Sequence, residues 1–395
     1  MTEVTGELKI QRAEKELITG ILSENLTDGN AIGLWRLPNS SKKHLIVCTE
    51  GPAQLDELPI EELGTGFVFA PFDSKKQKYF LKANKSCVFE KGEMISNNFI
   101  KSSYQDEVPR KLDHSPLAFY QSQLNGFSPL DKGDYIQLVD KSLEQINTGH
   151  FEKLVPSRCK KVVLPEQFEL IEAFNKLCAL YPNAFVSLVS IPEVGTWLGA
   201  SPELLVSVDH QMHFKTVAVA GTQAVQSDAD LKQVAWTQKE IEEQALVCRY
   251  IINCFKKIRL REYVELGPKT WKAGNLLHLK TEYEVDMNAT NFPQLGSVML
   301  KLLHPTSAVC GMPREASLAF LEAHENFDRS FYSGYLGPVN YENEISLFVN
   351  LRCMQWCGHE ALLYAGAGVT ADSVPQKEWE ETEMKMKTLL QVIQS

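Results

Sequence analysis

The sequence predicts an α+β fold built on antiparallel sheets, and two observations favour this class. Segments with strand-like composition come in clusters, often in hairpin-like pairs, and helical segments are interleaved without the strict alternation of a doubly wound fold. The chain has 395 residues, 44% of them hydrophobic, which is enough for one large single-core domain or for two or three average domains.

The first hundred residues mix short strand-like runs with Gly, Pro and Asn, and they carry no motif that points to chemistry. These runs are AIGLWRL (31–37), HLIVCTE (44–50) and GTGFVFAPF (64–72). The polar stretch 101–116 predicts a linker or a long surface loop.

Regular patterns become stronger from residue 131 onward. Ile136, Val139, Leu143 and Ile146 recur at three- and four-residue steps, which predicts a helix that ends near Gly149. Further helices are expected near 167–180, 230–258, 313–325 and 376–393. Strands are expected within 151–164, 195–200, 203–208, 213–222, 345–356 and 360–368.

Overall charge and cysteine content argue against several classes of protein. The 50 acidic and 40 basic residues give a net charge of −10, which argues against a nucleic-acid-binding surface. The N-terminus lacks the basic start and apolar core of a signal peptide, and no apolar run reaches the roughly 18 residues of a membrane span. The 9 scattered cysteines indicate reduced thiols. We therefore expect a cytoplasmic protein with no membrane or nucleic-acid partner.

Two acidic pentads, KEIEE at 239–243 and KEWEE at 377–381, are candidates for a metal site. On a helix, Glu240 and Glu243 lie on one face, and Glu378 and Glu381 stand in the same relation. If the two helices meet, four carboxylates converge, and their mutual repulsion favours a cation with oxygen ligands such as Mg²⁺. The alternative is that both pentads are ordinary solvated helix surface.

Lys153 and Glu203 are candidate acid–base groups. Strand periodicity gives Lys153 apolar neighbours, so it is either a side chain whose head reaches solvent or a partly desolvated amine able to act as a general base. Glu203 follows a Ser-Pro turn between two expected strands. It is either a surface residue or a pocket carboxyl whose raised pKa would let it donate a proton.

Other features could bind the carboxylates of a small substrate. The turns AVAGT (218–222) and YAGAG (364–368) can present backbone N–H groups, although ordinary tight turns have the same composition. Arg352 offers a fork of donors on a largely apolar strand, with a structural ion pair as the alternative. For Lys385 the alternative is an i,i+4 pair with Glu381.

Taken together, these strings resemble the chorismate-utilising enzyme family, which includes isochorismate synthases, salicylate synthases, and component I of anthranilate synthase and of aminodeoxychorismate synthase. Ten matches in family order are far more specific than any one of them. They run from about residue 150 to 390 and read EKLVPSR, GTWLGASPELL, AVAGT, KEIEEQALV, HLKT, LLHPTSAVCGMP, FDRSFYSGYLGPV, VNLRC, YAGAG and KEWEETEMKMK.

The resemblance implies a single large domain over 1–395, with antiparallel sheets packed as a sandwich and flanked by helices. Residues 1–115 would be its variable N-terminal part and 130–393 its chorismate-binding core. The two pentads would line one Mg²⁺ site. Within it, Glu243 and Glu381 would bind the metal directly, while Glu240 and Glu378 would act through water or by supporting the direct ligands.

The resemblance also implies an activity, because anthranilate synthases lack a lysine at the position of Lys153 and isochorismate synthases have one. Lys153 would activate water and Glu203 would protonate the leaving hydroxyl of chorismate. Gln223 stands where the family often has a basic residue, so no basic role is expected there. The expected substrate-binding residues are Gly221, Thr222, His304, Arg352, Gly366, Gly368 and Lys385.

Three alternatives to an isochorismate synthase remain open on the sequence. A salicylate synthase would go on to eliminate pyruvate, and an aminodeoxychorismate synthase component I would need an amidotransferase partner. A non-catalytic chorismate-binding protein is the third. We expect chorismate as substrate, no obligatory amidotransferase subunit and a monomer or weak dimer, with a product that feeds menaquinone or catechol siderophore synthesis.

Overall fold

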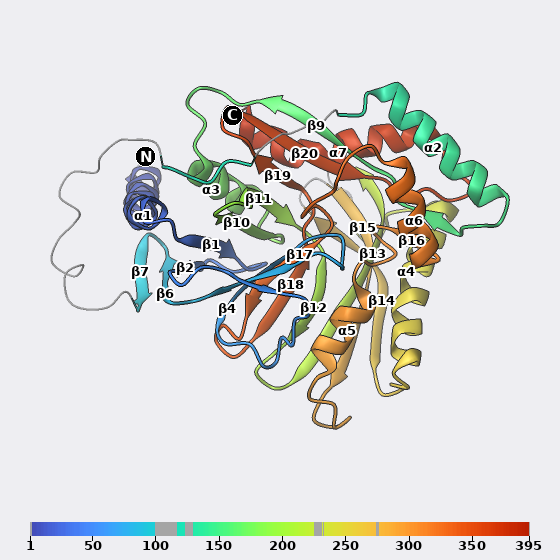
Figure 1. Cartoon of the computed structure of the whole chain (residues 1–395), viewed down its shortest axis with the longest axis horizontal. Coiled ribbons are helices and arrows are strands. Elements are labelled where there is room, and N and C mark those ends of the chain that lie inside the picture. The colour runs from blue at the N-terminus through green and yellow to red at the C-terminus, as the bar shows by residue number, and fades with distance from the viewer. Residues whose placement is uncertain are drawn as a thin grey trace.

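The computed structural model describes residues 2–98, 117–122, 129–224, 231, 233–273 and 276–394. The predicted linker at 101–116 lies outside this part of the chain. Seven helices are described (Figure 1): α1 (Thr2–Thr27), α2 (Lys132–Asn147), α3 (Leu170–Leu180), α4 (Gln238–Lys257), α5 (Leu295–Leu303), α6 (Arg314–His324) and α7 (Pro375–Ile393).

The strands form two large antiparallel sheets, which confirms the predicted fold class. The first sheet runs in the order β7 (Glu93–Asn97), β6 (Lys85–Glu90), β2 (Lys43–Cys48), β1 (Ala31–Arg36), β10 (Phe185–Ile191), β11 (Gly195–Ser201), β19 (Cys353–Trp356), β20 (Glu360–Gly366) and β9 (Ser157–Val163). The second runs β14 (Val264–Ala273), β15 (Leu276–Asp286), β13 (His213–Ala224), β12 (Leu204–Val208), β18 (Ile345–Val349), β17 (Tyr335–Val339), β4 (Gly66–Ala70), β5 (Lys78–Lys82) and β3 (Ala53–Leu55). A two-stranded sheet pairs β16 (Gly311–Met312) with β8 (Lys153–Leu154).

Strands from the first hundred residues join both large sheets, so this part of the chain is woven into the sandwich. Strand β1 pairs with β10 in the first sheet, and β4 pairs with β17 in the second. The boundary expected between residues 115 and 130 stays a prediction.

An aromatic core fills the space between the two sheets. Phe185 of the first sheet stacks on Phe348 of the second, with ring centroids 4.2 Å apart and planes 3° apart. Trp197 of β11 likewise meets Phe69 of β4 edge to face at 6.2 Å. Facing sheets with interdigitating inner side chains define a sandwich, and the burial of large rings is its main source of stability.

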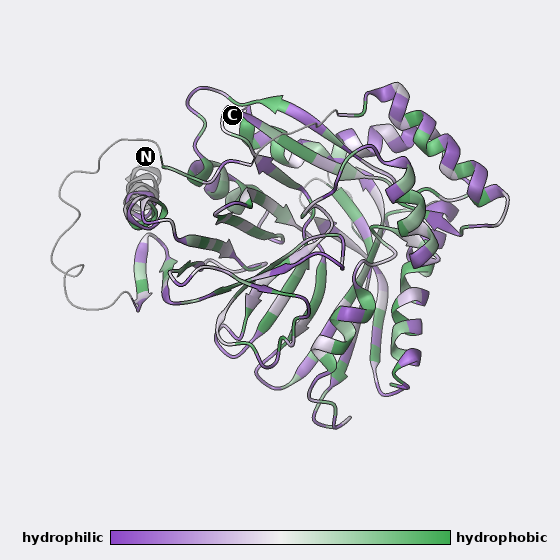
Figure 2. Cartoon of the chain, viewed as in Figure 1, coloured by the Kyte–Doolittle hydropathy of each residue, from purple (hydrophilic) through white to green (hydrophobic). Residues whose placement is uncertain are grey.

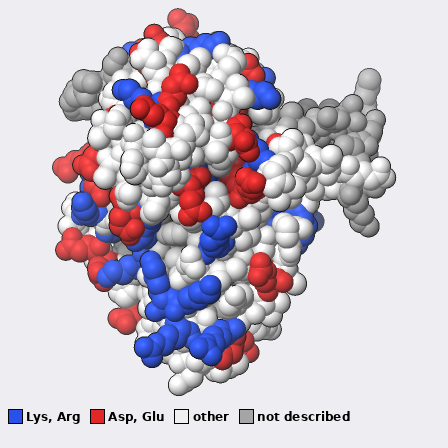
Figure 3. Space-filling view, turned by 90° about the vertical axis from the view of Figure 1, so that its right-hand side faces the viewer, with Lys and Arg blue, Asp and Glu red and all other residues white. Residues whose placement is uncertain are grey.

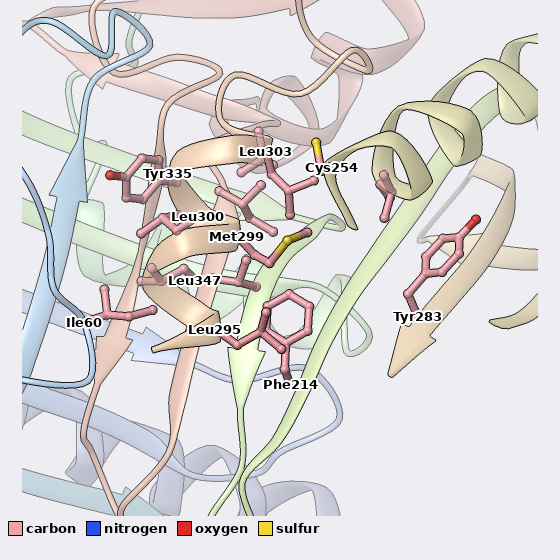
Figure 4. Packing of buried hydrophobic residues seen from close by; sticks show 14 of the residues in the cluster. Ile60, Phe214, Cys254, Tyr283, Leu295, Met299, Leu300, Leu303, Tyr335 and Leu347 are labelled. Carbon is pink, nitrogen blue, oxygen red and sulfur yellow. The ribbon is translucent and has the colours of Figure 1, made fainter. Parts of the chain in front are cut away.

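Helices cover the outer faces of the sandwich. Apolar side chains of α1, α3 and α7 pack on the first sheet, and those of α4 and α5 pack on the second. Figure 4 shows α5 wedged against the second sheet, where Leu295, Met299 and Leu303 approach strand residues and Cys254 of α4. Hydrophobic colour is concentrated on these inward faces, while α2 and α4 carry hydrophilic residues outward (Figure 2).

The predicted helices are found, with boundaries set by local chemistry. The Asp131 side chain accepts a hydrogen bond from the backbone N–H of Asp134 and caps α2, and Gly149 adopts a φ of +80° just after its C-terminal end. The helix expected from residue 230 begins only at Gln238, because Thr237 and Glu240 form a capping box. The sequence patterns described above predict neither α1 nor α5.

Two expected strands are each divided in two. Pro156 has no N–H to donate, and it separates β8 from β9 within 151–164. Arg352 has a left-handed backbone with a φ of +49°, and it separates β18 from β19 within 345–356. The expectation that Arg352 lies on a strand is therefore wrong, because the strand is interrupted at this residue.

Charge is unevenly distributed over the surface. On the face that is turned to the right in Figure 1, Lys and Arg gather in the lower part, although the chain as a whole carries a net charge of −10 (Figure 3). Among the described helices, none is long and apolar enough to cross a membrane.

Candidate active site

A cavity lies where β12, β13 and β15 of the second sheet approach β20 of the first sheet and helices α4 and α7. The residues that line it come from distant parts of the chain: Val155, Pro202, Glu203, Val219, Ala220, Gly221, Thr222, Glu243, His278, Ala308, Val309, Tyr332, Leu351, Arg352, Tyr364, Ala365, Gly366, Gly368 and Lys385. Most of the predicted catalytic and substrate-binding residues are in this set.

Glu203 is the buried acid of the cavity. It lies in the turn between β11 and β12, and only 6% of it is exposed. Burial raises its pKa to about 7, and the nearby charges of Lys153, Lys385 and Arg352 only partly oppose that rise. A carboxyl with this pKa is protonated in a substantial fraction of molecules near neutral pH and can donate a proton.

Arg352 and Lys385 supply positive charge to the same cavity. The left-handed backbone at Arg352 lies between two strands, and only 8% of the residue is exposed. Burial lowers the pKa of this guanidinium below its ordinary value, with Glu381 the largest opposing influence. Lys385 donates to the Gly366 carbonyl at 2.9 Å and pairs with Glu381 at 2.7 Å, so it makes the i,i+4 contact and also lines the cavity.

Lys153 is fully buried, so its ammonium does not reach solvent. Its Nζ lies 2.8 Å from Glu243 Oε1. Lys153 is not among the cavity-lining residues itself, but its partner Glu243 is. Burial raises the pKa of Glu243, but the charges of Lys153, Lys239 and Lys385 outweigh it and lower that pKa below its ordinary value. Glu243 is therefore held as a carboxylate.

Gly368 makes room for the Lys153–Glu243 pair. A Cβ atom at this position would lie 2.2 Å from Glu243 Oε1 and 3.0 Å from Lys153 Cε. Gly221 meets a different demand. It lies within β13, where the pairing with β15 shifts register between Ala220 and Gln223, and its φ of +66° suits this irregularity at the cavity wall. The turn expected at 218–222 is therefore wrong, because the strand continues to Ala224. These two glycines of the predicted turns are thus required by local geometry.

The two pentads lie on α4 and α7 as predicted, and one contact joins them. Lys239 Nζ of the first pentad lies 2.5 Å from Glu378 Oε1 of the second. Glu378 is fully buried, and its Oε2 has no hydrogen-bond partner. Burial and the neighbouring Glu381 raise the pKa of Glu378. Glu240 is engaged instead at the start of α4, where it accepts hydrogen bonds from Thr237.

His304 lies apart from the cavity wall. Its Nε2 approaches the carbonyl oxygens of Pro71 at 3.2 Å and Phe72 at 3.1 Å, and its ring meets Tyr335 edge to face. Burial lowers its pKa to about 4, so the ring is neutral and donates to a carbonyl. In this structure it ties the loop after β4 to the end of α5.

Three cavity residues had no role in the sequence prediction. His278 Nδ1 lies 2.8 Å from the Gly221 carbonyl oxygen, which assigns the ring proton to Nδ1, and its buried Nε2 has no partner. Burial and Arg352 lower its pKa to about 3, so Nε2 offers a neutral acceptor to the cavity. Tyr332 and Tyr364 stack at 5.3 Å and form an aromatic wall.

Comparison with known proteins identifies the family. The model of a family described as chorismate binding enzyme matches residues 71–394, so this chain belongs to that family.

Two curated relatives are both isochorismate synthases. The vibriobactin-specific enzyme of Vibrio cholerae is 29% identical over 262 residues, which span 65% of this chain and 65% of that protein. EntC of Escherichia coli is 28% identical over 306 residues, spanning 75% of this chain and 77% of EntC.

Solved structures show the same fold. A Bacillus anthracis protein described as the 2,3-dihydroxybenzoate-specific isochorismate synthase DhbC superposes with a TM-score of 0.73 at 23% identity, covering 95% of this chain and 99% of that chain. The menaquinone-specific isochorismate synthase MenF of Escherichia coli gives a TM-score of 0.70 at 19% identity, covering 92% of this chain and 88% of MenF.

Proposed function

We propose that this protein is an isochorismate synthase, which converts chorismate to isochorismate by adding water at C2 and releasing the C4 hydroxyl. The observation that carries the proposal is Glu203, a buried carboxyl with a pKa raised to about 7 in the wall of a cavity that also presents Arg352 and Lys385. The similarity to isochorismate synthases at 28–29% identity supports the same activity.

In the proposed reaction, Lys153 accepts a proton from water as the oxygen bonds to C2. The ring double bonds shift, the C4–O bond breaks, and Glu203 protonates the departing hydroxyl to give water. Each turnover leaves Lys153 with one proton more and Glu203 with one fewer, and exchange with solvent restores both. Acid–base groups of this kind typically contribute about 10²–10⁴-fold to the rate.

Arg352 and Lys385 are proposed to bind the two carboxylates of chorismate. Both side chains line the cavity, and a guanidinium fork suits bidentate contact with a carboxylate. His278 Nε2 can accept a hydrogen bond from a substrate hydroxyl, and the rings of Tyr332 and Tyr364 can pack against the cyclohexadiene ring.

The proposed cofactor is Mg²⁺, held by Glu243 and Glu381 directly and by Glu240 and Glu378 through water. The buried, unpartnered Glu378 Oε2 and the neighbouring Glu381 fit a cation that takes oxygen ligands. Within the described residues, no three acidic, histidine or cysteine side chains are already close enough to hold a metal together, so binding requires the carboxylates to shift. The bound cation would neutralise a substrate carboxylate.

The experiment is incubation of the pure protein with chorismate and Mg²⁺, with and without ammonium, followed by separation of the products. Isochorismate in both conditions supports the proposal. Salicylate with pyruvate would identify a salicylate synthase, aminodeoxychorismate would identify the ammonia-using branch, and unchanged chorismate would leave a binding protein. Relatives specific for vibriobactin and for menaquinone both match, so the same product can be expected for either pathway.

A further inference from the structure

The two pentads have the same pattern but place their lysines differently. Lys239, which begins the first pentad, points toward α7 and is 23% exposed, whereas Lys377, which begins the second, is exposed on the surface of α7. Only Lys239 therefore lies close enough to interact with the carboxylates of the other pentad.

Lys239 forms an ion pair with Glu378 that joins the two pentads. Its ammonium lies 2.5 Å from Glu378 Oε1, and the Glu378 carboxylate is 1% exposed. A carboxylate this buried needs a counter-charge, because an isolated ion in a low-dielectric interior is costly. Lys239 supplies that charge across the interface between α4 and α7.

Each of the three deeper carboxylates has its own lysine. Glu243 pairs with Lys153 at 2.8 Å, Glu381 with Lys385 at 2.7 Å, and Glu378 with Lys239. Lys153 and Lys385 already have proposed roles in the reaction. Lys239 is not among the cavity-lining residues and has no role there.

We propose that Lys239 is a built-in counter-ion that competes with Mg²⁺ for Glu378 and thereby sets the affinity of the metal site. This inference rests on the Mg²⁺ site of the proposed function and adds a residue that opposes metal binding. A cation that engages Glu378, directly or through water, has to displace the Lys239 ammonium or accept its repulsion. The flexible four-carbon side chain of lysine can then swing toward solvent, where part of it is already exposed.

The test compares Lys239→Met, Lys239→Arg and Lys377→Met with the native protein, without chorismate. Mg²⁺ affinity is measured by calorimetric titration with MgCl₂, and thermal unfolding is followed in EDTA and in saturating Mg²⁺. Lys377→Met is the matched control, because it removes the same charge from the equivalent position of the other pentad.

For Lys239→Met we expect a lower Tm in EDTA, since Glu378 loses its counter-charge, and Mg²⁺ affinity tighter by about tenfold, the effect of 1.4 kcal/mol. The rise in Tm on adding Mg²⁺ should therefore be larger than in the native protein. Lys239→Arg should bind Mg²⁺ several-fold more weakly, because a guanidinium pairs more firmly with a carboxylate. Lys377→Met should change the affinity by less than about twofold, as expected for an exposed charge.

Unchanged or weaker Mg²⁺ binding by Lys239→Met would overturn the inference, as would an equal gain in Lys377→Met. If Lys239→Met does not fold, Lys239→Arg decides, and tighter binding by that variant would overturn it. A native protein that binds no Mg²⁺ also overturns it, whatever its turnover. If the affinities change as expected and no isochorismate forms, the proposed activity fails and this inference stands.

Discussion

Lys153 Nζ lies 2.8 Å from Glu243 Oε1, in an ion pair that joins strand β8 to helix α4. The lysine is fully buried, and Gly368 faces the pair so closely that a Cβ atom there would lie 2.2 Å from the glutamate oxygen. A proposed catalytic base, a proposed metal ligand and a glycine of the predicted YAGAG turn thus form one packed unit. Its geometry allows each part to be tested separately.

Gly368→Ala should disrupt this unit without removing a charged group. The new methyl would force the Lys153–Glu243 pair apart, and overpacking of this kind typically costs about 1–3 kcal/mol of stability. Because the displaced groups are the proposed catalytic base and a proposed metal ligand, turnover should fall by about 10²-fold. Gly64→Ala is the control, since nothing lies within 4 Å of a Cβ there. Steady-state kinetics and Tm check this, and near-native turnover of Gly368→Ala would contradict the arrangement.

Lys153→Ala should remove water activation and lower kcat by about 10²–10⁴-fold. Chorismate binding should be largely retained, because Arg352 and Lys385 still face the cavity. Tm should also fall, since Glu243 loses its partner. Lys161→Ala serves as control, because that lysine is exposed and makes only a surface pair with Glu360. Most of the native turnover surviving in Lys153→Ala would rule out the proposed mechanism.

The antiparallel α+β class was predictable because it depends on local patterns. Strand-like runs, helix periodicity and caps such as Asp131 act over a few residues, and the structure confirms the helices they predict. Strand order was not predictable. Strands β1 and β10, for example, are neighbours although they are separated by most of the first half of the chain, and only tertiary packing brings them together.

The site residues likewise divide into those that local sequence patterns predict and those that only the folded structure reveals. The pentads, Glu203 and the glycine turns are visible as strings, and the structure brings most of them to one cavity. His278 and Tyr332 became evident only in the structure, because a histidine or tyrosine in an apolar segment is usually a core residue. Likewise, no local pattern distinguishes Lys239, which points inward, from Lys377, which is exposed.

The pentad carboxylates should separate into two classes. Glu243→Gln and Glu381→Gln should sharply raise the Mg²⁺ concentration needed for turnover, because each removes a proposed direct ligand. Glu242→Gln and Glu380→Gln should change it little, since both side chains are exposed and accept hydrogen bonds from Gln238 and Gln376 on their own helices. Turnover measured against Mg²⁺ concentration after EDTA treatment checks this. Equal losses in all four variants would refute the two-helix site.

Glu203 should connect the pH dependence of activity to that of stability. Its pKa is raised from 4.5 to about 7, so the folded protein holds a proton that the unfolded chain releases between these pH values. This contribution to stability is fully present below about pH 4.5 and is lost as pH rises through about 7. The loss is on the order of 3 kcal/mol for a fully buried group.

Glu203→Gln, which is permanently neutral, should escape that loss. Relative to the native protein its free energy of unfolding should improve between pH 5 and 8, while its kcat falls because the proton donor is gone. In the native enzyme, kcat/KM should decline as pH rises above about 7, with a midpoint near that of the stability change. Glu166→Gln, an exposed site, should show neither effect. Denaturant unfolding and kcat/KM, each measured across this pH range, decide the matter. A stability difference independent of pH would show that Glu203 does not hold a proton in the folded state, and the proposed acid would then have to be another group.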